Sequence, residues 1–262
     1  MYFVSPQNCI ISAGQSTSPF VVRSQSTMIP VLYRDSHLLI CDKPVGVSSE
    51  SPGLPDLIED HLGFSVYPVH RLDRGTGGVV ILALSSASCS ALQKLFQANC
   101  IRKEYLAVIY GCPSETSGYF EDYLFHDKKK NKSFIVDRPR TGVKKAVCSW
   151  ELCGSIFCKD GWYSLVRVLL HTGRTHQIRV QFASRGFPLI GDRRYGCKVK
   201  ADHPALWAVN ISFPHPFMKN SPVSARSMPP HSFPWDLFRY PGEATTAASP
   251  FVDGSVNLSP DF

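Results

Sequence analysis

Apolar residues along the chain fall mostly in short runs of strand length, separated by turns rich in Gly, Pro, Asp and Ser. The segment VLYRDSHLLICDKP (31–44) predicts two strands joined by a turn, and GGVVILAL (77–84) predicts a fully buried strand. Further strands are predicted in KEYLAVIYG, AVCSWELC, WYSLVRVLLHTG and, as the last one, ALWAVNISFPHP. Because strands outnumber helices and often follow one another, the pattern favours an α+β domain on a largely antiparallel sheet.

Three other segments repeat their apolar residues at helical spacing. LPDLIEDHLG ends at Gly63, a residue that commonly follows a helix, and RTHQIRVQFASRG ends in the same way at Gly186. SSASCSALQKLFQAN predicts a helix that begins at Ser85 or Ser86. The residues of this helix that are expected to be buried are Leu92, Leu95 and Phe96.

The sheet pattern begins at about residue 29, which predicts one domain over 29–240, a disordered lead over 1–28 and a disordered tail over 241–262. Residues 1–27 contain no acidic residue, so an organelle-targeting peptide is the alternative to a cytoplasmic location, although it would carry a single arginine. Residues 112–146 are rich in Pro, Lys and Gly and predict an exposed excursion from the sheet.

Charge and cysteine content narrow the class of partner. The chain has 28 Lys and Arg against 21 Asp and Glu, a net charge of +7, which favours an anionic partner and nucleic acid first. No window approaches the roughly 18 apolar residues of a membrane helix, so no membrane partner is expected. Nine cysteines are spread singly without a CxxC pair, which favours reduced thiols and predicts no metal.

Two short segments concentrate the residues that could carry chemistry. HRLDRGTGG places Asp73 just before a buried strand, where a carboxylate is costly unless paired and a nearby arginine would hold it ionised. HTGRTHQIR leaves a strand and enters a helix, whose first backbone N–H groups favour anions. Its polar residues at that point are Arg174, His176, Gln177 and Arg179. Both segments lie at strand ends, so we expect one shared cleft, although each alone could be an ordinary ion pair or helix cap.

Together with their neighbours, these segments resemble the RluA-type pseudouridine synthases. HRLDRGTGGVVILAL is similar to the catalytic motif of that family, and other segments follow the family order. These are VLYRDSHLLICDKPVGV, KEYLAVIYG, LLHTGRTHQIRVQFASRGFPLIGDRRYG and ISFPHP. The resemblance covers roughly residues 29–217. It implies a mixed, mostly antiparallel central sheet in two halves, with flanking helices, a central active-site cleft and no S4-type RNA-binding module.

The resemblance also implies a reaction and its residues. Asp73 matches the essential aspartate of the family, Tyr105 the tyrosine that packs on the target base, and Arg179 the arginine that pairs with the aspartate. The reaction would isomerise uridines in ribosomal or transfer RNA to pseudouridine, an intramolecular transfer that needs no cofactor and no metal. Asp73 would either attack C1′ of the sugar or remove a proton beside it, and the sequence leaves both open. The habit of the family implies a monomer.

RNA contacts are predicted from the basic and polar residues around these motifs. They are Arg71, Arg74, Thr76, Arg174, His176, Gln177, Arg193, Arg194 and the lysines of 128–132. His70 and His176 are equally compatible with structural roles. Two positions depart from the family pattern. Gly77 occupies a position where the family usually has Ser, and Gln181 occupies the position after IRV (178–180), where the family often has His. Gly77 is expected to loosen the loop, and Gln181 to alter substrate contacts.

Two other functions stay open at this point. A non-catalytic RNA-binding relative would keep the cleft without turnover, although all three residues assigned to chemistry are present. A hydrolase would use Asp73 as nucleophile on another glycosidic bond, but such enzymes usually need a second carboxylate as acid, and HTGRTHQIR contains none.

Overall fold

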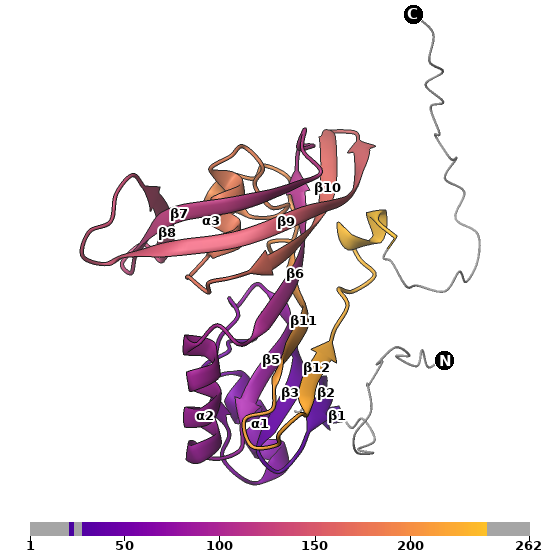
Figure 1. Ribbon diagram of the computed structural model, residues 1–262. Helices are drawn as coiled ribbons and strands as arrows, with labels where there is room; N and C mark the ends of the chain where they lie inside the picture. Colours follow the sequence, from indigo (N-terminus) through magenta and orange to yellow (C-terminus); the bar gives the residue numbers. More distant parts are fainter. Residues whose placement is uncertain (1–20, 24–27, 240–262) are drawn as a thin grey trace, which may run out of the picture.

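The computed structural model describes residues 21–23 and 28–239, and this part of the chain is built around one 12-stranded sheet (Figure 1). The strands pair in the order β1-β2-β3-β5-β11-β6-β10-β9-β7-β8, with β4 added to β5 and β12 to β11. Every pairing is antiparallel except that of β5 with β11. The strands are β1 (Val21–Arg23), β2 (Met28–Arg34), β3 (Leu38–Lys43), β4 (Tyr67–Pro68), β5 (Gly77–Ala83), β6 (Arg102–Tyr110), β7 (Ser117–Asp127), β8 (Lys132–Val136), β9 (Val143–Cys158), β10 (Gly161–Leu170), β11 (Leu206–Pro214) and β12 (Pro222–Arg226).

The sheet divides the molecule into two halves, as the resemblance implies (Figure 1). Strands β1 to β5 and β12 form the lower half of the figure, and β7 to β10 form the upper half. The strands β6 and β11 run side by side through both halves and join them. The prediction of an α+β fold on a mostly antiparallel sheet is confirmed.

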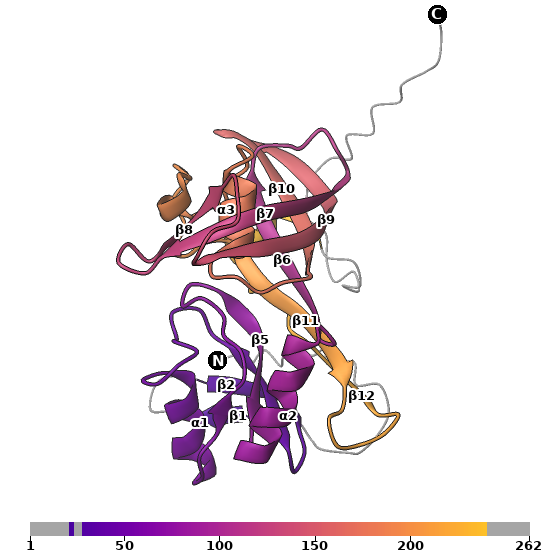
Figure 2. The ribbon, with the colours of Figure 1, turned by 60° about the vertical axis from the view of Figure 1, so that its left-hand side comes forward.

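The helices cover opposite faces of this sheet. In α1 (Leu54–Leu62), Ile58 packs in one core with Val80 of β5, whereas Leu92 of α2 (Ser86–Gln97) packs with Val79 and Ile81. Successive residues of a strand point to opposite faces, so α1 and α2 lie on different sides of β5 (Figure 2). The short helix α3 (Gln177–Ala183) shares the α1 face, in the upper half. Two 3-10 turns, η1 (Arg193–Tyr195) and η2 (Trp235–Leu237), complete the elements.

Local sequence signals account for the helix ends. The carboxylate of Asp56 accepts the backbone N–H of Gly53 at 2.6 Å at the start of α1. After this helix, Gly63 adopts the left-handed conformation with φ 74° and donates its N–H to the carbonyl of Glu59 at 2.8 Å. The hydroxyl of Ser85 accepts the N–H of Ser88, so α2 begins as predicted.

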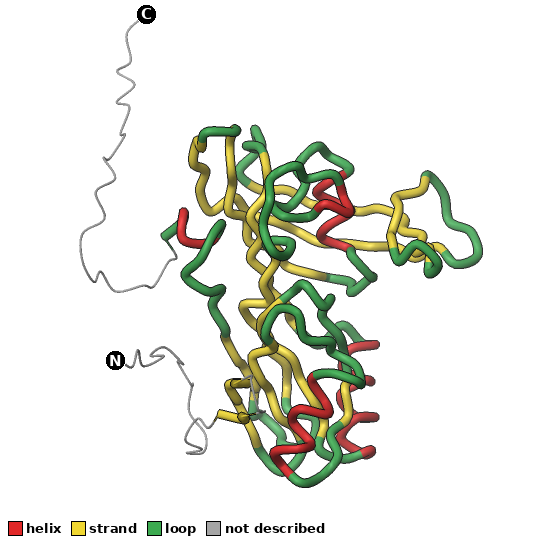
Figure 3. Tube along the Cα trace, turned by 180° about the vertical axis from the view of Figure 1, so that it is seen from behind, coloured by secondary structure: helices red, strands yellow, loops and turns green. Residues whose placement is uncertain are grey.

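The prediction of an exposed excursion over 112–146 is wrong. The segment forms β7 and β8 and enters β9, and β7 pairs with β9 along most of its length. Phe120 and Leu124 of β7 are buried, while Tyr119 and Glu121 on its other face are exposed. Such a half-buried strand has the composition of a loop but the period of a strand. The hairpin of β7 and β8 projects from the upper half, as the view from behind also shows (Figure 3).

The sheet also extends past its predicted limits. The strand β1 pairs with β2 inside the segment expected to precede the domain, and β12 pairs with β11 after the strand expected to be the last. With two buried apolar residues, Val223 and Ala225, β12 is too short to stand out in the sequence. The segments 1–20, 24–27 and 240–262, and with them the predicted disordered tail, lie outside the described residues.

One expectation for α2 is only partly confirmed. Leu92 is fully buried, but Leu95 and Phe96 are half-buried. The ring of Phe96 lies 4.9 Å from the ring of His70, centroid to centroid, so Phe96 covers this histidine instead of entering the core.

His70 lies between β4 and the loop before β5, and its side chain makes a structural contact with β5. Its Nε2 atom accepts the backbone N–H of Ile81 at 2.9 Å, which requires an unprotonated Nε2. Burial lowers the pKa of His70 to about 3, and the nearby charge of Lys103 lowers it further. His70 is therefore neutral at pH 7 and ties the loop that carries Asp73 to the sheet.

The neutral state of His70 predicts an acid-sensitive fold. In the unfolded chain the histidine takes up a proton near pH 6.5, whereas in the folded chain it does so only near pH 3, so stability falls as the pH drops through this window. Between pH 7 and pH 5 we expect His70 to account for a loss on the order of 1–2 kcal/mol in the free energy of unfolding. Urea denaturation of the wild type and of His70→Gln at both pH values measures this. An identical loss in both proteins would contradict it.

Candidate active site

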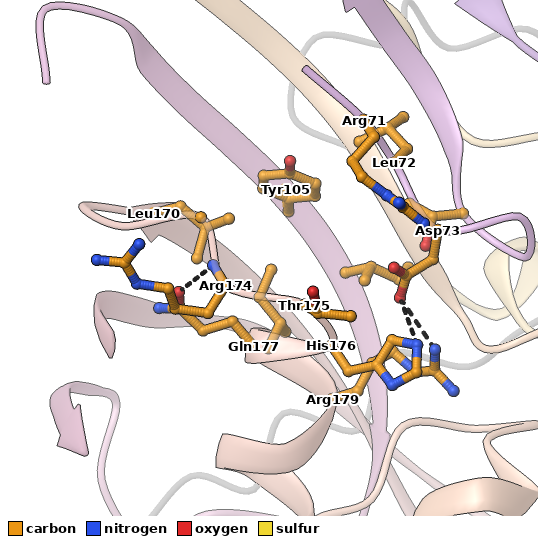
Figure 4. Close-up of a pocket in the computed structure, with 14 residues that line it drawn as sticks. Arg71, Leu72, Asp73, Tyr105, Leu170, Arg174, Thr175, His176, Gln177 and Arg179 are labelled. Atoms are coloured by element: carbon orange, nitrogen blue, oxygen red, sulfur yellow. Dashed lines mark hydrogen bonds and ion pairs between the residues drawn. The ribbon is translucent and has the colours of Figure 1, made fainter. Parts of the chain in front are cut away.

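The two polar segments singled out in the sequence meet at one pocket, where the two halves of the sheet join (Figure 4). The pocket has a volume of about 130 Å³. It lies between the loop before β5, the strand β6 and the entry to α3. Its lining residues are Arg71, Leu72, Asp73, Thr76, Tyr105, Leu170, Gly173, Arg174, Thr175, His176, Gln177, Ile178, Arg179 and Leu206. The expectation of one shared cleft is thus confirmed.

Asp73 is held by a tight loop. The backbone N–H of Thr76 donates to the carbonyl of Asp73 at 2.9 Å. One residue earlier, Leu72 exchanges hydrogen bonds with the buried hydroxyl of Ser49, which accepts from its N–H and donates to its carbonyl. The side chain of Asp73 is 20% exposed, so its carboxylate faces the pocket without being fully in water.

Arg179 joins two carboxylates from distant parts of the chain. Its Nη1 donates to Oδ2 of Asp73 at 2.9 Å, while Nε and Nη2 donate to the two oxygens of Asp192 at 2.6 and 2.9 Å. Burial opposes the charged form, but the hydrogen bonds and charges of Asp192 and Asp73 outweigh it and raise the pKa of Arg179. Arg179 therefore stays cationic, and each of its three guanidinium nitrogens donates a hydrogen bond to a carboxylate oxygen.

Tyr105 extends from β6 into the pocket opposite this pair (Figure 4). It is 8% exposed, and its neighbours in the sheet are Val168 and Ala208. Burial raises the pKa of Tyr105, and the charge of Asp73 adds to the rise. The residue presents a neutral phenol and an apolar ring face, which suits stacking against a flat base.

Two charged residues of this region were missed in the sequence. Asp192, 1% exposed, lies in the GDRRYG segment that follows a buried stretch. Lys43, at the end of β3, is fully buried and donates to the carbonyls of Pro44 and Val47 at 3.0 and 2.8 Å. Burial lowers the pKa of Lys43 to about 8, and the charge of Asp73 opposes the decrease. In the sequence, both Asp192 and Lys43 could have been noticed as charged residues at the end of an apolar segment.

The residues predicted to contact RNA fall into two groups. Arg71 and Arg174 line the pocket, and Arg71 forms an exposed ion pair with Glu50 at 2.7 Å. Thr76 and His176 also line it but are buried, and Arg74 is exposed beside it, donating to the carbonyl of Gly46 at 2.7 Å.

Of the three other predicted contacts, Gln177 lines the pocket, whereas Arg193 and Arg194 do not. Both ends of the Gln177 amide are engaged inside the protein, because Oε1 accepts from Thr172 and Arg174 and Nε2 donates to Val147. Arg193 and Arg194 line a neighbouring cavity behind Arg179, of about 380 Å³. Arg194 also donates to the carbonyls of Lys130 and Asn131, which fixes the turn between β7 and β8.

The two departures from the family pattern have structural explanations. A Cβ atom at Gly77 would lie 2.2 Å from the ring of Trp207, so the indole occupies the space that a serine would need. Gln181 does not line the pocket. It is fully buried and donates to Asp122 at 2.8 Å, so the expectation that it alters substrate contacts is not supported by its position.

Asp192 is the second carboxylate that a hydrolase would need, and its environment argues against that role. Both of its oxygens accept from Arg179, and it is almost fully buried. A general acid must donate a proton to the leaving group, whereas both oxygens of Asp192 accept hydrogen bonds from Arg179 and Asp192 does not line the pocket.

Within residues 21–23 and 28–239, no group of three His, Cys, Asp or Glu side chains is placed to hold a metal ion. Among the helices of these residues, none is long and apolar enough to cross a lipid bilayer.

Residues 37–184 match the family described as RNA pseudouridylate synthase. The chain is 31% identical to ribosomal large subunit pseudouridine synthase D of Borreliella burgdorferi, over 67% of this chain and 57% of the relative. It is 30% identical to tRNA pseudouridine synthase C of Pectobacterium carotovorum, over 72% of this chain and 54% of the relative. The chain thus spans little more than half of these two relatives. The dual-specificity RNA pseudouridine synthase RluA of Escherichia coli K12 is 30% identical, over 75% of this chain and 92% of the relative.

Solved structures with the same fold include two human proteins. Human RNA pseudouridylate synthase domain containing 1 has a TM-score of 0.67 at 21% identity, over 77% of this chain and 84% of that one. Domain containing 4 has a TM-score of 0.63 at 22% identity, over 76% and 88%. The expected fold of a central sheet in two halves is therefore confirmed.

The double pairing of Arg179 predicts a separable effect on stability. Arg179→Met leaves Asp192 buried without a partner, so we expect the free energy of unfolding to fall by about 3–5 kcal/mol in urea denaturation. Adding Asp192→Asn removes the stranded charge and should restore part of this loss. The double variant still lacks the cation beside Asp73, so the activity of the site should not return with the stability. Equal stability of the single and double variants would contradict the pairing.

Proposed function

The chain belongs to the RNA pseudouridylate synthase family, and on this basis we propose that it isomerises specific uridines in structured RNA to pseudouridine. The observation that carries the proposal is the ion pair of Asp73 with Arg179 in the wall of a pocket that Tyr105 also lines. The printed names of the relatives refer to ribosomal and transfer RNA, and we propose the same two substrate classes here. The catalytic unit would comprise residues 29–240 together with β1.

The proposed reaction rearranges one nucleotide without adding a group. The N1–C1′ bond breaks, a C5–C1′ bond forms, the C5 proton leaves and N1 gains a proton. Asp73 would act at the sugar, by attack on C1′ or by removal of an adjacent proton. Arg179 would pair with Asp73 and orient it, and Tyr105 would stack on the uracil and assist the C5 proton transfer. The apolar lining residues Leu72, Leu170 and Leu206 would exclude water from the base.

A uridine inside a helix would have to leave its stack to enter this pocket. Unstacking costs a few kcal/mol, which a loop or bulge reduces, so we propose a structured RNA with an accessible uridine. The basic residues around the entrance would contact phosphates, and the lysines of the turn between β7 and β8 would extend that surface. A monomer in the cytoplasm remains our proposal for assembly and location, on the resemblance and the cysteine pattern of the sequence.

The proposed reaction predicts a pseudouridine that depends on Asp73. RNA from cells with this gene and from a deletion strain would be mapped by carbodiimide-stop sequencing. We expect at least one site to vanish on deletion and to return with the wild type but not with Asp73→Asn, which keeps the shape of the side chain and removes its charge. Asp60→Asn, at an exposed position of α1, is the matched control and should restore the site.

Three outcomes would count against this reading. If no site changes on deletion, the chain is a non-catalytic RNA-binding relative. If Asp73→Asn restores the site, the chemistry has been placed on the wrong residue. If free uracil is released from the RNA, the enzyme is a hydrolase, because a synthase retains the base.

The proposed phosphate contacts predict a weaker salt dependence after neutralisation. Arg174→Gln and Arg193→Gln should each weaken RNA binding and reduce the slope of log K against log salt concentration by roughly one. Lys94→Gln, on the outer surface of α2, is the control and should leave the slope unchanged. Fluorescence anisotropy at several salt concentrations measures the slope. An unchanged slope in both arginine variants would place the RNA elsewhere.

A further inference from the structure

His176 occupies a strained backbone position beside the carboxylate of Asp73. Its φ of 57° lies in the left-handed region, which glycine adopts freely and other residues adopt at a cost. Such strain persists only where the surroundings enforce it, and it is common in residues of functional sites. Glycine would serve the backbone better at this position, so the imidazole ring needs an explanation of its own.

A chain of hydrogen bonds favours one tautomer of that ring. The backbone N–H of Ser133 donates to the phenol oxygen of Tyr195 at 2.8 Å. Nδ1 of His176 lies 3.0 Å from the same oxygen, and the hydroxyl of Tyr195 has one proton that it can donate to this nitrogen. With Nδ1 as acceptor, the proton of a neutral imidazole sits on Nε2. This Nε2 atom lies 3.6 Å from Oδ2 of Asp73.

Ser133 contacts both the phenol of Tyr195 and the backbone next to His176. It is 1% exposed, and its hydroxyl donates at 2.6 Å to the carbonyl of Thr175, the residue before His176. The same hydroxyl lies 3.1 Å from Nδ1 of His126, whose ring meets that of His176 edge to face at 6.0 Å. The strand β8 therefore holds the backbone that enters His176 and the phenol that orients its ring.

Both neighbours of Asp73 engage the same oxygen. Nη1 of Arg179 and Nε2 of His176 approach Oδ2, so Oδ1 is the oxygen that can turn to a substrate (Figure 4). A separation of 3.6 Å is long for a hydrogen bond, but contacts of catalytic groups often tighten only when substrate is bound.

We propose that His176 is a positioning residue for Asp73, held by Tyr195 as the Nε2–H tautomer so that it directs Oδ2 towards α3 and leaves Oδ1 for the sugar. This inference rests on the proposed function, since it concerns the geometry of the same carboxylate. His176 does not touch the reacting atoms in this role.

The charges around His176 support a neutral ring. Burial lowers the pKa of His176 to about 4, the charge of Asp73 opposes the decrease, Arg179 and Arg194 add to it, and Asp192 opposes it. The other ionisable groups that face the ring are Tyr195 and His126. A neutral His176 offers Asp73 an oriented N–H dipole, so Arg179 remains the cation that pairs with the carboxylate.

The first test separates the ring from the backbone strain. His176→Gly removes the imidazole and relieves the left-handed backbone, which offsets part of the stability lost with the buried ring, so the protein should still unfold cooperatively in urea. We expect kcat on the RNA identified by mapping to fall roughly tenfold or more, with KM little changed, because the loss concerns a group that orients the carboxylate. Asn220→Gly is the matched control, since Asn220 has a φ of 56° and lies in the exposed turn between β11 and β12. Its kcat should equal that of the wild type.

The second test reads the tautomer directly and needs no activity. Long-range ¹H–¹⁵N correlation spectra of the imidazoles at pH 7 should place the His176 proton on Nε2. Tyr195→Phe removes the hydroxyl that donates to Nδ1, so we expect the Nε2–H form to lose its preference and kcat to fall in the same direction as in His176→Gly. A proton on Nδ1 of His176 in the wild type would overturn the proposal.

The outcomes separate this inference from the proposed function. If the wild type converts no uridine, the proposed function fails, and the proposed role of His176 in it fails as well. If Asp73→Asn is inactive while His176→Gly and Tyr195→Phe keep the kcat of the wild type, the positioning role is overturned and the synthase remains. Should His176→Gly fail to fold, His176→Asn, which tolerates the left-handed backbone, takes its place with the same expected loss of kcat.

Discussion

The site depends on one guanidinium that compensates two carboxylates. Arg179 binds Asp192 through two hydrogen bonds and Asp73 through a third, all from a side chain that is itself 9% exposed. A buried arginine with a single partner would leave part of its fork unsatisfied, and a buried Asp192 without arginine would be an uncompensated charge. Because Asp192 holds the guanidinium in place, the remaining nitrogen, Nη1, donates to Asp73 in a fixed orientation. The carboxylate of Asp73 is thus oriented by the ion pair of Arg179 with Asp192.

The sheet brings the partners of this cluster together. Asp73 stands before β5, Tyr105 on β6 and Arg179 on α3, and the parallel pairing of β5 with β11 places the start of β5 against the strands that join the two halves. This approach needs glycine, because a Cβ atom at Gly78 would lie 2.2 Å from the carbonyl oxygen of Ala208. The glycines after Asp73 therefore serve the packing of two strands as well as the turn of the loop.

Sequence patterns were most reliable where the signal was local. Apolar runs identified the buried strands, Ser85 and Gly63 marked helix ends, and the resemblance led to Asp73, Tyr105 and Arg179, which the structure brings to one pocket. Residues 112–146 were misread because only Phe120 and Leu124 of the 11 residues of β7 are buried. Strand β12 was missed because its stability comes from pairing with β11 and its five residues carry little pattern of their own.

By itself, the sequence determined the kind of fold and pointed to the residues proposed for the chemistry, since alternation, capping and motif order are properties of neighbouring residues. The resemblance implied that Arg179 pairs with Asp73, and the tertiary structure alone decided which further charge joins them. Arg179 and Asp73 lie 106 residues apart, and Asp192 completes the cluster from a third segment. The same holds for Lys43 and for the contact of His176 with Tyr195 and Ser133, which spans α3, η1 and β8. Burial and electrostatic compensation act between groups that are close in space, and distance along the chain carries no record of which groups those are.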